Sequence, residues 1–255
     1  MLKAIIKKIF NFLGFSIHRY QKNLITVNIK DWTPLKINND NFKLYFSGLK
    51  KSKEEWTDSF SKQLRLYSLI QLVKKNLSTE SNLGDFAECG CWKGHSSYII
   101  SSLIKGSEKK INFHIFDSFE GLSVSSKEDD EFFKKTEEQK KFMTNHFRSS
   151  EVFLKQDVLE EFNFIKIYKG WIPSRFSEVS NLKFSFVHLD VDLYQPTLDS
   201  LEFFFPRLAS GGIIVCDDYN SSQFPGAKNA WDQYFKDKKL NLFYEQPFGG
   251  CYLIK

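Results

Sequence analysis

VHLDVD at residues 187–192 and IIVCDD at residues 213–218 are the two stretches that decide the fold of this chain. Each is an apolar, β-branched run that ends in carboxylates, which is the pattern of a buried strand with charged groups at its carboxyl end. The segment between them, residues 195–210, has helical periodicity and is followed by Gly211 and Gly212. A strand, a helix and a strand in this order predict two parallel strands of an open α/β sheet, whose carboxyl edge is where ligands bind.

The two strand ends are expected to gather Asp190, Asp192, Asp217 and Asp218 at that edge. Four neighbouring anions repel one another and resist desolvation, so they need a compensating cation or a function that uses a raised pKa. No His or Cys pair stands nearby at metal-binding spacing, and carboxylate oxygens alone favour Mg2+, Mn2+ or Ca2+ over zinc. Because Asp is also common in turns and caps, a group of solvated turn residues is the alternative.

The length and the cysteines of the chain predict one α/β domain in a reducing compartment. A chain of 255 residues can bury one sizeable core and carry some additional elements. Its four cysteines, at positions 89, 91, 216 and 251, form neither a CxxC pair nor a disulfide framework, and no signal peptide cleavage site is recognisable. These features predict a cytoplasmic protein.

The net charge of +5 lies entirely in residues 1–24, which contain five Lys and Arg residues and no Asp or Glu. The rest of the chain is formally neutral, which argues against a nucleic-acid-binding groove. No apolar run approaches the roughly 20 residues that span a bilayer. A basic amphipathic helix is expected instead, able to lie on the inner membrane face, on a neighbouring subunit or on its own domain. Its apolar residues at helical spacing are Leu2, Ile5, Ile6, Ile9 and Leu13.

Three regions are expected along the chain: the basic helix at residues 1–24, an N-terminal connection and helix at 25–78, and the main domain at 79–255. The helix of the second region has apolar periodicity over residues 54–77. Strands and helices alternate in the main domain. Besides the acidic pair, we expect strands at 85–89, 112–116, 165–168 and 250–254, and helices at 96–104 and 151–162.

A charged stretch at residues 123–147 interrupts this alternation. It directly follows the carboxyl end of a predicted strand, which is where a lid over a binding site would lie. A solvated helical excursion, stabilised by charge pairs between residues i and i+4, is the alternative.

A glycine turn follows the first predicted strand, in the sequence GDFAECGCWKGHSS at residues 84–97. Gly90 and Gly94 permit a tight turn and a close approach to a ligand. Ser96 opens the next helix, whose N-terminal amides favour an anion. The spacing is not the GxGxxG pattern of dinucleotide sites, and an acidic residue, Glu88, stands in the strand before it.

The second predicted strand ends in Asp117, which supports a nucleotide-like ligand. Its distance in sequence from the glycines is that at which a carboxylate accepts hydrogen bonds from ribose hydroxyls. The alternative is that Asp117 caps the turn that begins at Ser118. The expected ligand has a ribose and an anionic end that need not be a phosphate.

Five motifs together resemble the macrocin O-methyltransferase family, whose members are sugar O-methyltransferases that use S-adenosylmethionine and a divalent metal. The resemblance covers roughly residues 54–255 and leaves out the basic N-terminal helix. The motifs are GDFAECGCWKGHSS (84–97), FDSFEGL (116–122), LDVDLYQPTLDSL (189–201), SGGIIVCDDY (210–219) and GGCYLIK (249–255).

The resemblance implies a class I methyltransferase fold: a Rossmann-like, mostly parallel seven-stranded sheet with helices on both faces and one antiparallel strand near the end. It implies that Asp190, Asp217 and Asp218 hold Mg2+ or another hard divalent cation, and it favours a homo-oligomer. Val191 stands where the family commonly has a glycine, and this valine is expected to narrow the acceptor pocket. The residues that the resemblance places at S-adenosyl-L-methionine are Glu88, Gly90, Gly94, Ser96, Asp117, Ser118, Gly170 and Trp171.

The expected reaction is an in-line transfer of a methyl group to a sugar hydroxyl, in a glycan, a lipid-linked sugar or a glycosylated metabolite. Asp192 is expected to accept the proton of the attacking hydroxyl, and Asp190 is the alternative base. We expect His188 and His95 to be structural. Two other functions stay open. One is a phenolic or catechol O-methyltransferase in which aromatic residues stack on the acceptor, and the other is a non-catalytic scaffold. The aromatic residues for the first are Phe119, Trp171 and Tyr194.

Overall fold

A computed structural model describes residues 40–79, 84–129 and 134–255. The basic helix predicted for residues 1–24 lies outside the described residues. The chain divides into two compact units, residues 1–43 and 44–255, and the second unit contains the sheet and the candidate site. Helix α2 (Asp40–Lys51) begins in the first unit and ends in the second.

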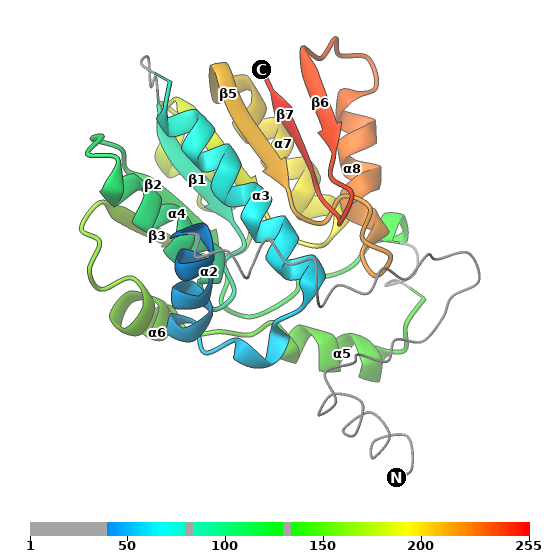
Figure 1. Cartoon of the computed structure of the whole chain (residues 1–255). Helices are drawn as coiled ribbons and strands as arrows, with labels where there is room; N and C mark the ends of the chain where they lie inside the picture. The colour runs from blue at the N-terminus through cyan, green and yellow to red at the C-terminus, as the bar shows by residue number, and fades with distance from the viewer. Residues whose placement is uncertain (1–39, 80–83, 130–133) are drawn as a thin grey trace, which may run out of the picture. The chain divides into compact units, whose positions relative to one another are not determined.

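A seven-stranded sheet forms the centre of the second unit (Figure 1). Its strands are β1 (Asp85–Cys89), β2 (Phe113–Asp117), β3 (Ile165–Lys169), β4 (Phe184–Leu189), β5 (Leu208–Cys216), β6 (Leu242–Glu245) and β7 (Cys251–Ile254). They lie in the order β3-β2-β1-β4-β5-β7-β6, and β7 is antiparallel to both of its neighbours. The pairs among the first five strands are parallel, so the predicted mostly parallel sheet with one antiparallel strand is confirmed.

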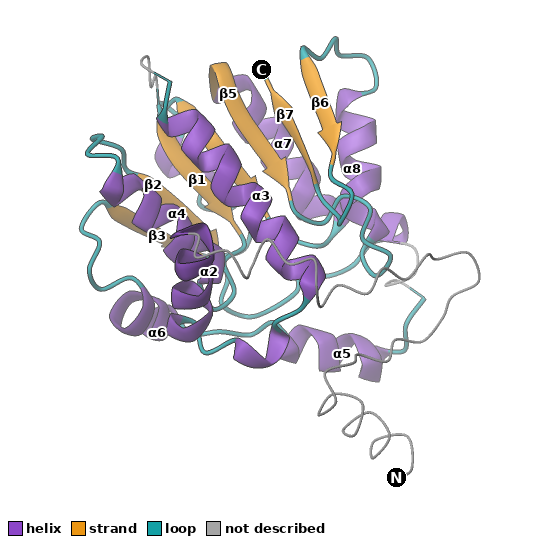
Figure 2. Cartoon of the chain, in the orientation of Figure 1, coloured by secondary structure: helices purple, strands orange, loops and turns teal. Residues whose placement is uncertain are grey.

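Helices cover both faces of the sheet (Figure 2). On one face α3 (Phe60–Leu77) packs against α4 (His95–Gly106), and on the other α7 (Tyr194–Arg207) packs against α8 (Pro225–Phe235). Both faces of the central strands are therefore buried, which explains why their sequences are mostly apolar on both sides. The other short elements are η2 (Glu55–Thr57), η3 (Lys127–Asp129), α5 (Glu137–His146), α6 (Glu151–Phe153), the π-helical turn η4 (Leu154–Val158) and η5 (Phe176–Val179).

The cysteines are free thiols inside the folded domain. All four cysteines are buried and unpaired, as the sequence predicts. None of the helices in the described ranges has the length and apolar character that crossing a bilayer requires.

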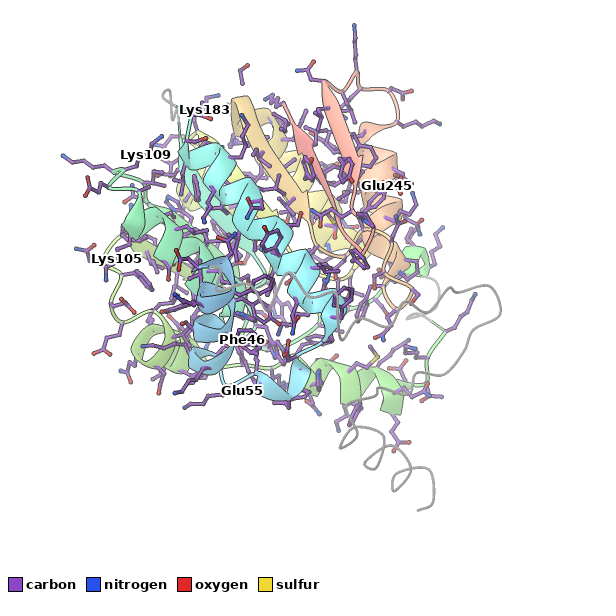
Figure 3. All side chains as sticks on the ribbon, in the orientation of Figure 1. Phe46, Glu55, Lys105, Lys109, Lys183 and Glu245 are labelled. Carbon is purple, nitrogen blue, oxygen red and sulfur yellow. The ribbon has the colours of Figure 1, made fainter. Side chains whose placement is uncertain are left out.

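Lys109 and Lys183, which precede β2 and β4, project from the amino-terminal edge of the sheet (Figure 3). The acidic residues of the predicted site belong to the opposite edge.

Two predicted helices are shorter than expected. The helix predicted over residues 54–77 begins at Phe60, because Ser59 acts as the N-cap and accepts a hydrogen bond from the Lys62 backbone N–H at 3.2 Å. The residues before it form η2 instead. The helix predicted over residues 151–162 consists of α6 followed by η4 and ends at Val158.

The predicted end of α7 is wrong, because Gly211 and Gly212 lie inside β5. Leu208 pairs with Phe184 while Ile213 pairs with Phe186, so the residues between Leu208 and Ile213 bulge out of the ladder. Gly211 has φ +75°, a backbone conformation that glycine adopts without strain. Helix α8 and strand β6 were not predicted from the sequence.

An aromatic cluster joins α7 to the sheet. Phe204 has no exposed surface, and its ring packs edge-to-face on Phe176 and Phe184 with centroids 5.0 Å apart in each pair. Phe116 of β2 lies 5.8 Å from the same ring. Because α7 directly follows the Asp190–Asp192 segment, this packing also fixes the position of the acidic residues.

We expect Phe204→Ala to lower the free energy of unfolding by about 3–5 kcal/mol, because it removes a fully buried ring and leaves a cavity. Phe142→Ala is the matched control, since Phe142 on α5 is 73% exposed and its loss should change stability by less than about 0.5 kcal/mol. Urea denaturation followed by circular dichroism measures both values. A Phe204→Ala variant as stable as the control variant would contradict this view of the core.

Candidate functional site

The carboxyl ends of the central strands bring the predicted acidic residues together. Asp190 directly follows β4, and its backbone N–H donates to the carbonyl of Cys89, at the end of β1, over 2.9 Å. Asp217 follows β5 and donates to the carbonyl of Leu189 over 2.8 Å. The three strands thus end level with one another, and their carboxylates meet at one edge, as the sequence predicts.

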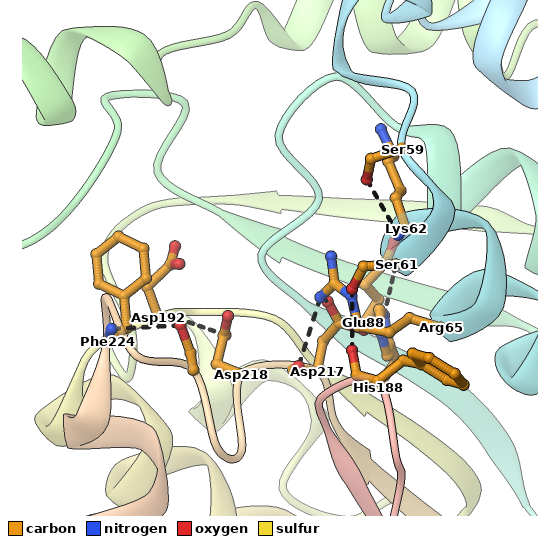
Figure 4. A network of polar contacts seen from close by, with 12 residues as sticks. Ser59, Ser61, Lys62, Arg65, Glu88, His188, Asp192, Asp217, Asp218 and Phe224 are labelled. Atoms are coloured by element: carbon orange, nitrogen blue, oxygen red, sulfur yellow. Dashed lines mark hydrogen bonds and ion pairs between the residues drawn. The ribbon is translucent and has the colours of Figure 1, made fainter. Parts of the chain in front are cut away.

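Asp190, Asp217 and Asp218 form a set that fits a divalent cation. One oxygen from each of them lies within 4.8 Å of the others. The donors are oxygens only, which hard cations such as Mg2+ prefer. Asp192 stands beside this set, and its backbone N–H donates to a carboxylate oxygen of Asp218 over 2.8 Å (Figure 4).

Burial and repulsion by neighbouring carboxylates raise the pKa of three of these groups, Asp190, Asp192 and Asp218. Burial, and after it the charge of Asp217, raises the pKa of Asp190 to about 7. Burial is also the largest cause that raises the pKa of Asp192 and Asp218 well above the ordinary value, and neighbouring carboxylates add to the effect. Four bare anions are therefore unfavourable here, and a bound cation or protons must relieve them.

Arg65 of α3 also reaches this acidic cluster, although no sequence motif marks it. Its guanidinium forms an ion pair with the carboxylate of Asp217 (Figure 4). The charge of Asp217 is the largest cause that raises the pKa of Arg65, and Asp190 is among the smaller ones. Because α3 lies far from the acidic motifs in sequence, only the tertiary structure shows the contact.

Glu88 belongs to a buried charged pair beneath the cluster. It has no exposed surface, and its carboxylate accepts hydrogen bonds from the Ser97 hydroxyl and, at 2.9 Å, from Nδ1 of His188. Burial lowers the pKa of His188, but the hydrogen bond and charge of Glu88 outweigh it and raise the pKa to about 9. Glu88 thus points into the protein, and its expected contact with a cofactor stays a prediction.

The glycine turn between β1 and α4 is held by close packing and by Asp117. Gly90 has φ +78°, and a side chain there would collide with the carbonyl of Asp190. One carboxylate oxygen of Asp117 accepts the backbone N–H groups of Cys91, at 2.7 Å, and Trp92, at 3.1 Å. Asp117 therefore connects the end of β2 to the glycine turn by hydrogen bonds, and these bonds fix the shape of the space between the two segments.

Two adjoining cavities open along this edge of the sheet. The smaller, of about 90 Å³, is lined by four of the predicted cofactor residues, namely Gly90, Asp117, Ser118 and Trp171. The larger, of about 590 Å³, contains Ser96, Arg65 and the acidic cluster. Asp190 and Asp192 line both cavities, so they stand at the boundary between them.

Two other predicted cofactor residues line neither of these cavities. Gly94 has φ +89°, and a side chain there would collide with Leu154 of η4. Gly170 donates its backbone N–H to the carbonyl of Asp117 over 2.9 Å. Both glycines therefore support the walls of the site through close backbone packing, and any direct contact with a cofactor stays a prediction.

An aromatic rim, made of Trp56, Trp92 and His146, borders the larger cavity. Trp56 of η2 is 62% exposed, and its ring lies edge-to-face 6.1 Å from Trp92 and 5.3 Å from His146. Trp92 and His146 line the cavity, and the ammonium of Lys93 lies 5.5 Å from the Trp56 ring. Large exposed aromatic groups of this kind are typical of binding surfaces. The sequence analysis missed the rim, since its members come from three separate segments.

The predicted insertion at residues 123–147 folds as two pieces, η3 and α5. Asp129 of η3 is 1% exposed and accepts the backbone N–H of Tyr194, at the start of α7, over 2.6 Å. Helix α5 lies on the side of the sheet to which the parallel strands point (Figure 1). The segment enters and leaves at one place, where Glu120 and Arg148 form an antiparallel bridge. A lid function for it stays a prediction.

A solved methyltransferase structure shares the fold of this chain. The O-methyltransferase NovP superposes with a TM-score of 0.60 at 21% sequence identity, over 76% of this chain and 80% of NovP. The sheet order and this likeness show the class I methyltransferase fold that the sequence predicted.

The chain belongs to the family described as Macrocin-O-methyltransferase (TylF), whose sequence pattern matches residues 23–245. The predicted resemblance is thus confirmed, although the match begins earlier and ends earlier than the motifs suggested. The Gly-Gly-Cys-Tyr motif at the end of the chain falls outside it.

Two curated relatives come from Streptomyces. The 8-demethyl-8-(2,3-dimethoxy-alpha-L-rhamnosyl)-tetracenomycin-C 4'-O-methyltransferase of Streptomyces olivaceus is 26% identical over 154 residues, 59% of this chain and 58% of that protein. The demethyldecarbamoylnovobiocin O-methyltransferase of Streptomyces niveus is 24% identical over 155 residues, with the same two shares. The chain thus aligns with less than two thirds of either relative.

We expect Glu88→Gln to lower the free energy of unfolding by about 3–5 kcal/mol, because it leaves a buried His188 without its charged partner. Glu120→Gln is the control, since Glu120 lies on the surface and its side chain should matter by less than about 0.5 kcal/mol. Urea denaturation at pH 7 measures the difference. Equal stability of the two variants would show that the buried pair of Glu88 and His188 does not stabilise the protein.

Proposed function

We propose that this protein transfers a methyl group from S-adenosylmethionine to a hydroxyl of a sugar, in a glycan or a glycosylated metabolite, with the help of a divalent cation. One observation carries the proposal: Asp190 and Asp192 line both cavities. The smaller cavity contains Asp117, the carboxylate expected to bind a ribose, and the larger contains the carboxylates expected to bind a cation. The donor and acceptor of a methyl transfer must approach to about 3 Å, and a shared boundary permits this.

The smaller cavity would hold the adenosine part of S-adenosylmethionine. The Asp117 carboxylate already accepts three backbone N–H groups, those of Cys91 and Trp92 on one oxygen and that of Phe119, at 2.7 Å, on the other. A ribose hydroxyl would use the lone pair that remains on the second oxygen. Trp171, which is 40% exposed, offers an aromatic face to the adenine. The methionine end of the cofactor would extend into the larger cavity, where Ser96 lies at the start of α4 and the helix amides favour a carboxylate group.

Asp190, Asp217 and Asp218 would hold the cation. When bound, Mg2+ would make the acceptor hydroxyls more acidic and would orient them. Asp192 is our candidate for the general base, because it lies outside the cation set and lines both cavities. Burial and the neighbouring carboxylates raise its pKa, which makes it a stronger base than an ordinary aspartate. Asp190 is the alternative base.

The aromatic rim and the relatives support a sugar-bearing acceptor. A sugar ring presents apolar C–H groups that pack on aromatic faces, and its hydroxyls bind carboxylates, so a cavity with both linings suits it. The name of the Streptomyces olivaceus relative specifies a rhamnosyl compound, and that of the Streptomyces niveus relative a novobiocin compound.

The two alternative functions have less support. Of the three aromatic residues expected to stack on a phenolic acceptor, Phe119 and Tyr194 are buried at 6% and 7% exposure, and only Trp171 is substantially exposed. A non-catalytic scaffold would have no use for a cluster of carboxylates that repel one another and cost stability.

We expect Asp217→Asn to lose Mg2+-dependent methyl transfer by about 100-fold or more, because it removes a cation ligand, while binding of S-adenosylmethionine stays unchanged. Calorimetry measures cofactor binding, and release of S-adenosylhomocysteine with p-nitrophenyl α-L-rhamnoside as acceptor measures transfer. Asp199→Asn, a surface change on α7, is the control. Undiminished transfer by Asp217→Asn would refute the cation role, and a wild-type protein that does not bind S-adenosylmethionine would refute the proposed function.

We expect Trp56→Ala to raise the KM for the same aryl glycoside about tenfold and to leave kcat nearly unchanged, because the rim binds the acceptor but does not touch the reacting atoms. Initial-rate kinetics give both constants. Phe142→Ala removes another largely exposed aromatic ring, one that lies outside the rim, and should change neither constant. An unchanged KM in Trp56→Ala would place the acceptor elsewhere.

A further inference from the structure

Arg65 occupies an unusual position for a residue of a cation-binding site. It lies on α3 and not on the strands that supply the acids, and its guanidinium pairs with the carboxylate of Asp217 (Figure 4). Its side chain is 27% exposed and that of Asp217 is 12% exposed, so both charges are largely removed from water. An ion pair in such a place is strongly favoured over either charge alone.

The position of Arg65 is built into the fold. Helix α3 packs against β4 and β5, and near its start the hydroxyl of Ser61 donates to the carbonyl of Phe248 over 3.0 Å. The next residue of that loop, Gly249, borders the aliphatic stem of Arg65, because a Cβ there would stand 3.4 Å from the arginine Cδ. The helix and the loop before β7 thus hold the guanidinium against the acids.

The charges around Arg65 come from all four carboxylates. Asp217 is the nearest, and Asp190, Asp218 and Asp192 attract the guanidinium as well. An arginine keeps its positive charge under all ordinary conditions. It therefore supplies part of the compensation that four clustered carboxylates require.

A divalent cation and Arg65 compete for the same carboxylate. The cation set contains Asp217, the residue to which the guanidinium is paired. A cation held by Asp190, Asp217 and Asp218 would also place two further positive charges beside the guanidinium, which repel it. A cation bound to Asp217 therefore weakens the pairing of this carboxylate with the guanidinium.

We propose that Arg65 is a displaceable counter-ion, which neutralises the acidic cluster when no divalent cation is bound and gives up Asp217 when one binds. This inference rests on the cation site of the proposed function. It assigns Arg65 as a positioning residue, one that keeps the cation ligands together and sets how tightly a cation is held. Since Arg65 lines the larger cavity, its released guanidinium stays beside the space assigned to the acceptor.

The test is calorimetric titration of MnCl2 into the full chain, stripped with EDTA, for the wild type and for Arg65→Gln. Removal of the competing charge should tighten Mn2+ binding about tenfold or more. The matched control is Lys62→Gln: Lys62 lies on the same helix and lines the same cavity, but pairs with Glu54 at 2.6 Å, and its loss should leave Mn2+ affinity unchanged. Equal or weaker Mn2+ binding by Arg65→Gln would overturn the inference.

Thermal unfolding supplies a second readout. In EDTA, Arg65→Gln should melt below the wild type, because the acids lose their counter-ion, and saturating Mn2+ should restore most of the difference. A melting temperature equal to that of the wild type in EDTA would overturn the inference. If Arg65→Gln does not fold in EDTA, Arg65→Lys replaces it in the titration. This variant keeps the charge without the planar fork and should bind Mn2+ more tightly than the wild type, so equal affinity would overturn the inference.

The outcomes separate this inference from the proposed function. Absence of Mn2+ binding in both the wild type and Arg65→Gln would overturn the counter-ion role and the cation site together, while binding of S-adenosylmethionine would still support a methyltransferase. Tighter Mn2+ binding by Arg65→Gln in a protein that does not bind S-adenosylmethionine would uphold the counter-ion role and refute the methyltransferase.

Discussion

Repulsion among the carboxylates at the ends of β4 and β5 is the constraint on which the rest of the site depends, because the other contacts must offset it. The surrounding residues reduce this repulsion in several ways. The guanidinium of Arg65 pairs with Asp217, and the backbone N–H of Asp192 donates to Asp218. A protonated His188 lies beneath the cluster, paired with Glu88. Each contact partly offsets the cost of placing acids together away from water. The aromatic packing of α7 then fixes the loop that carries Asp190 and Asp192.

Much of the fold could be predicted because the central strands are buried on both faces. Their mostly apolar sequences stand out from the rest of the chain, so the bounds predicted for β1 and the parallel pairing of β4 with β5 were right. Strand β6 is mostly exposed and leaves no comparable pattern. Helix α8 does carry a signal that was not used, Pro225 in its first turn. The bulge at Gly211 depends on the partner strand, which local sequence does not encode.

The site could be predicted where its residues end adjacent strands, and not where they meet only in the folded chain. Asp190, Asp217 and Asp218 gather as expected, because parallel register alone brings them level. Arg65 and Trp56 come from segments that precede the sheet, and a single Trp or a charged residue in a helical segment does not by itself indicate a binding site. Glu88 shows a further limit: its place in the motif was clear, but a sequence does not tell that its side chain turns inward toward His188.

The bridge between Glu120 and Arg148 has a consequence for how this fold can diversify. Because the segment that it closes departs from the sheet and returns at a single point, residues can be added, deleted or exchanged within the segment without shifting the register of any strand. The entropic cost of a longer loop between fixed ends grows only slowly with its length. The segment between Glu120 and Arg148 is thus a place where the fold can vary in length and composition while the strands of the sheet keep their pairing.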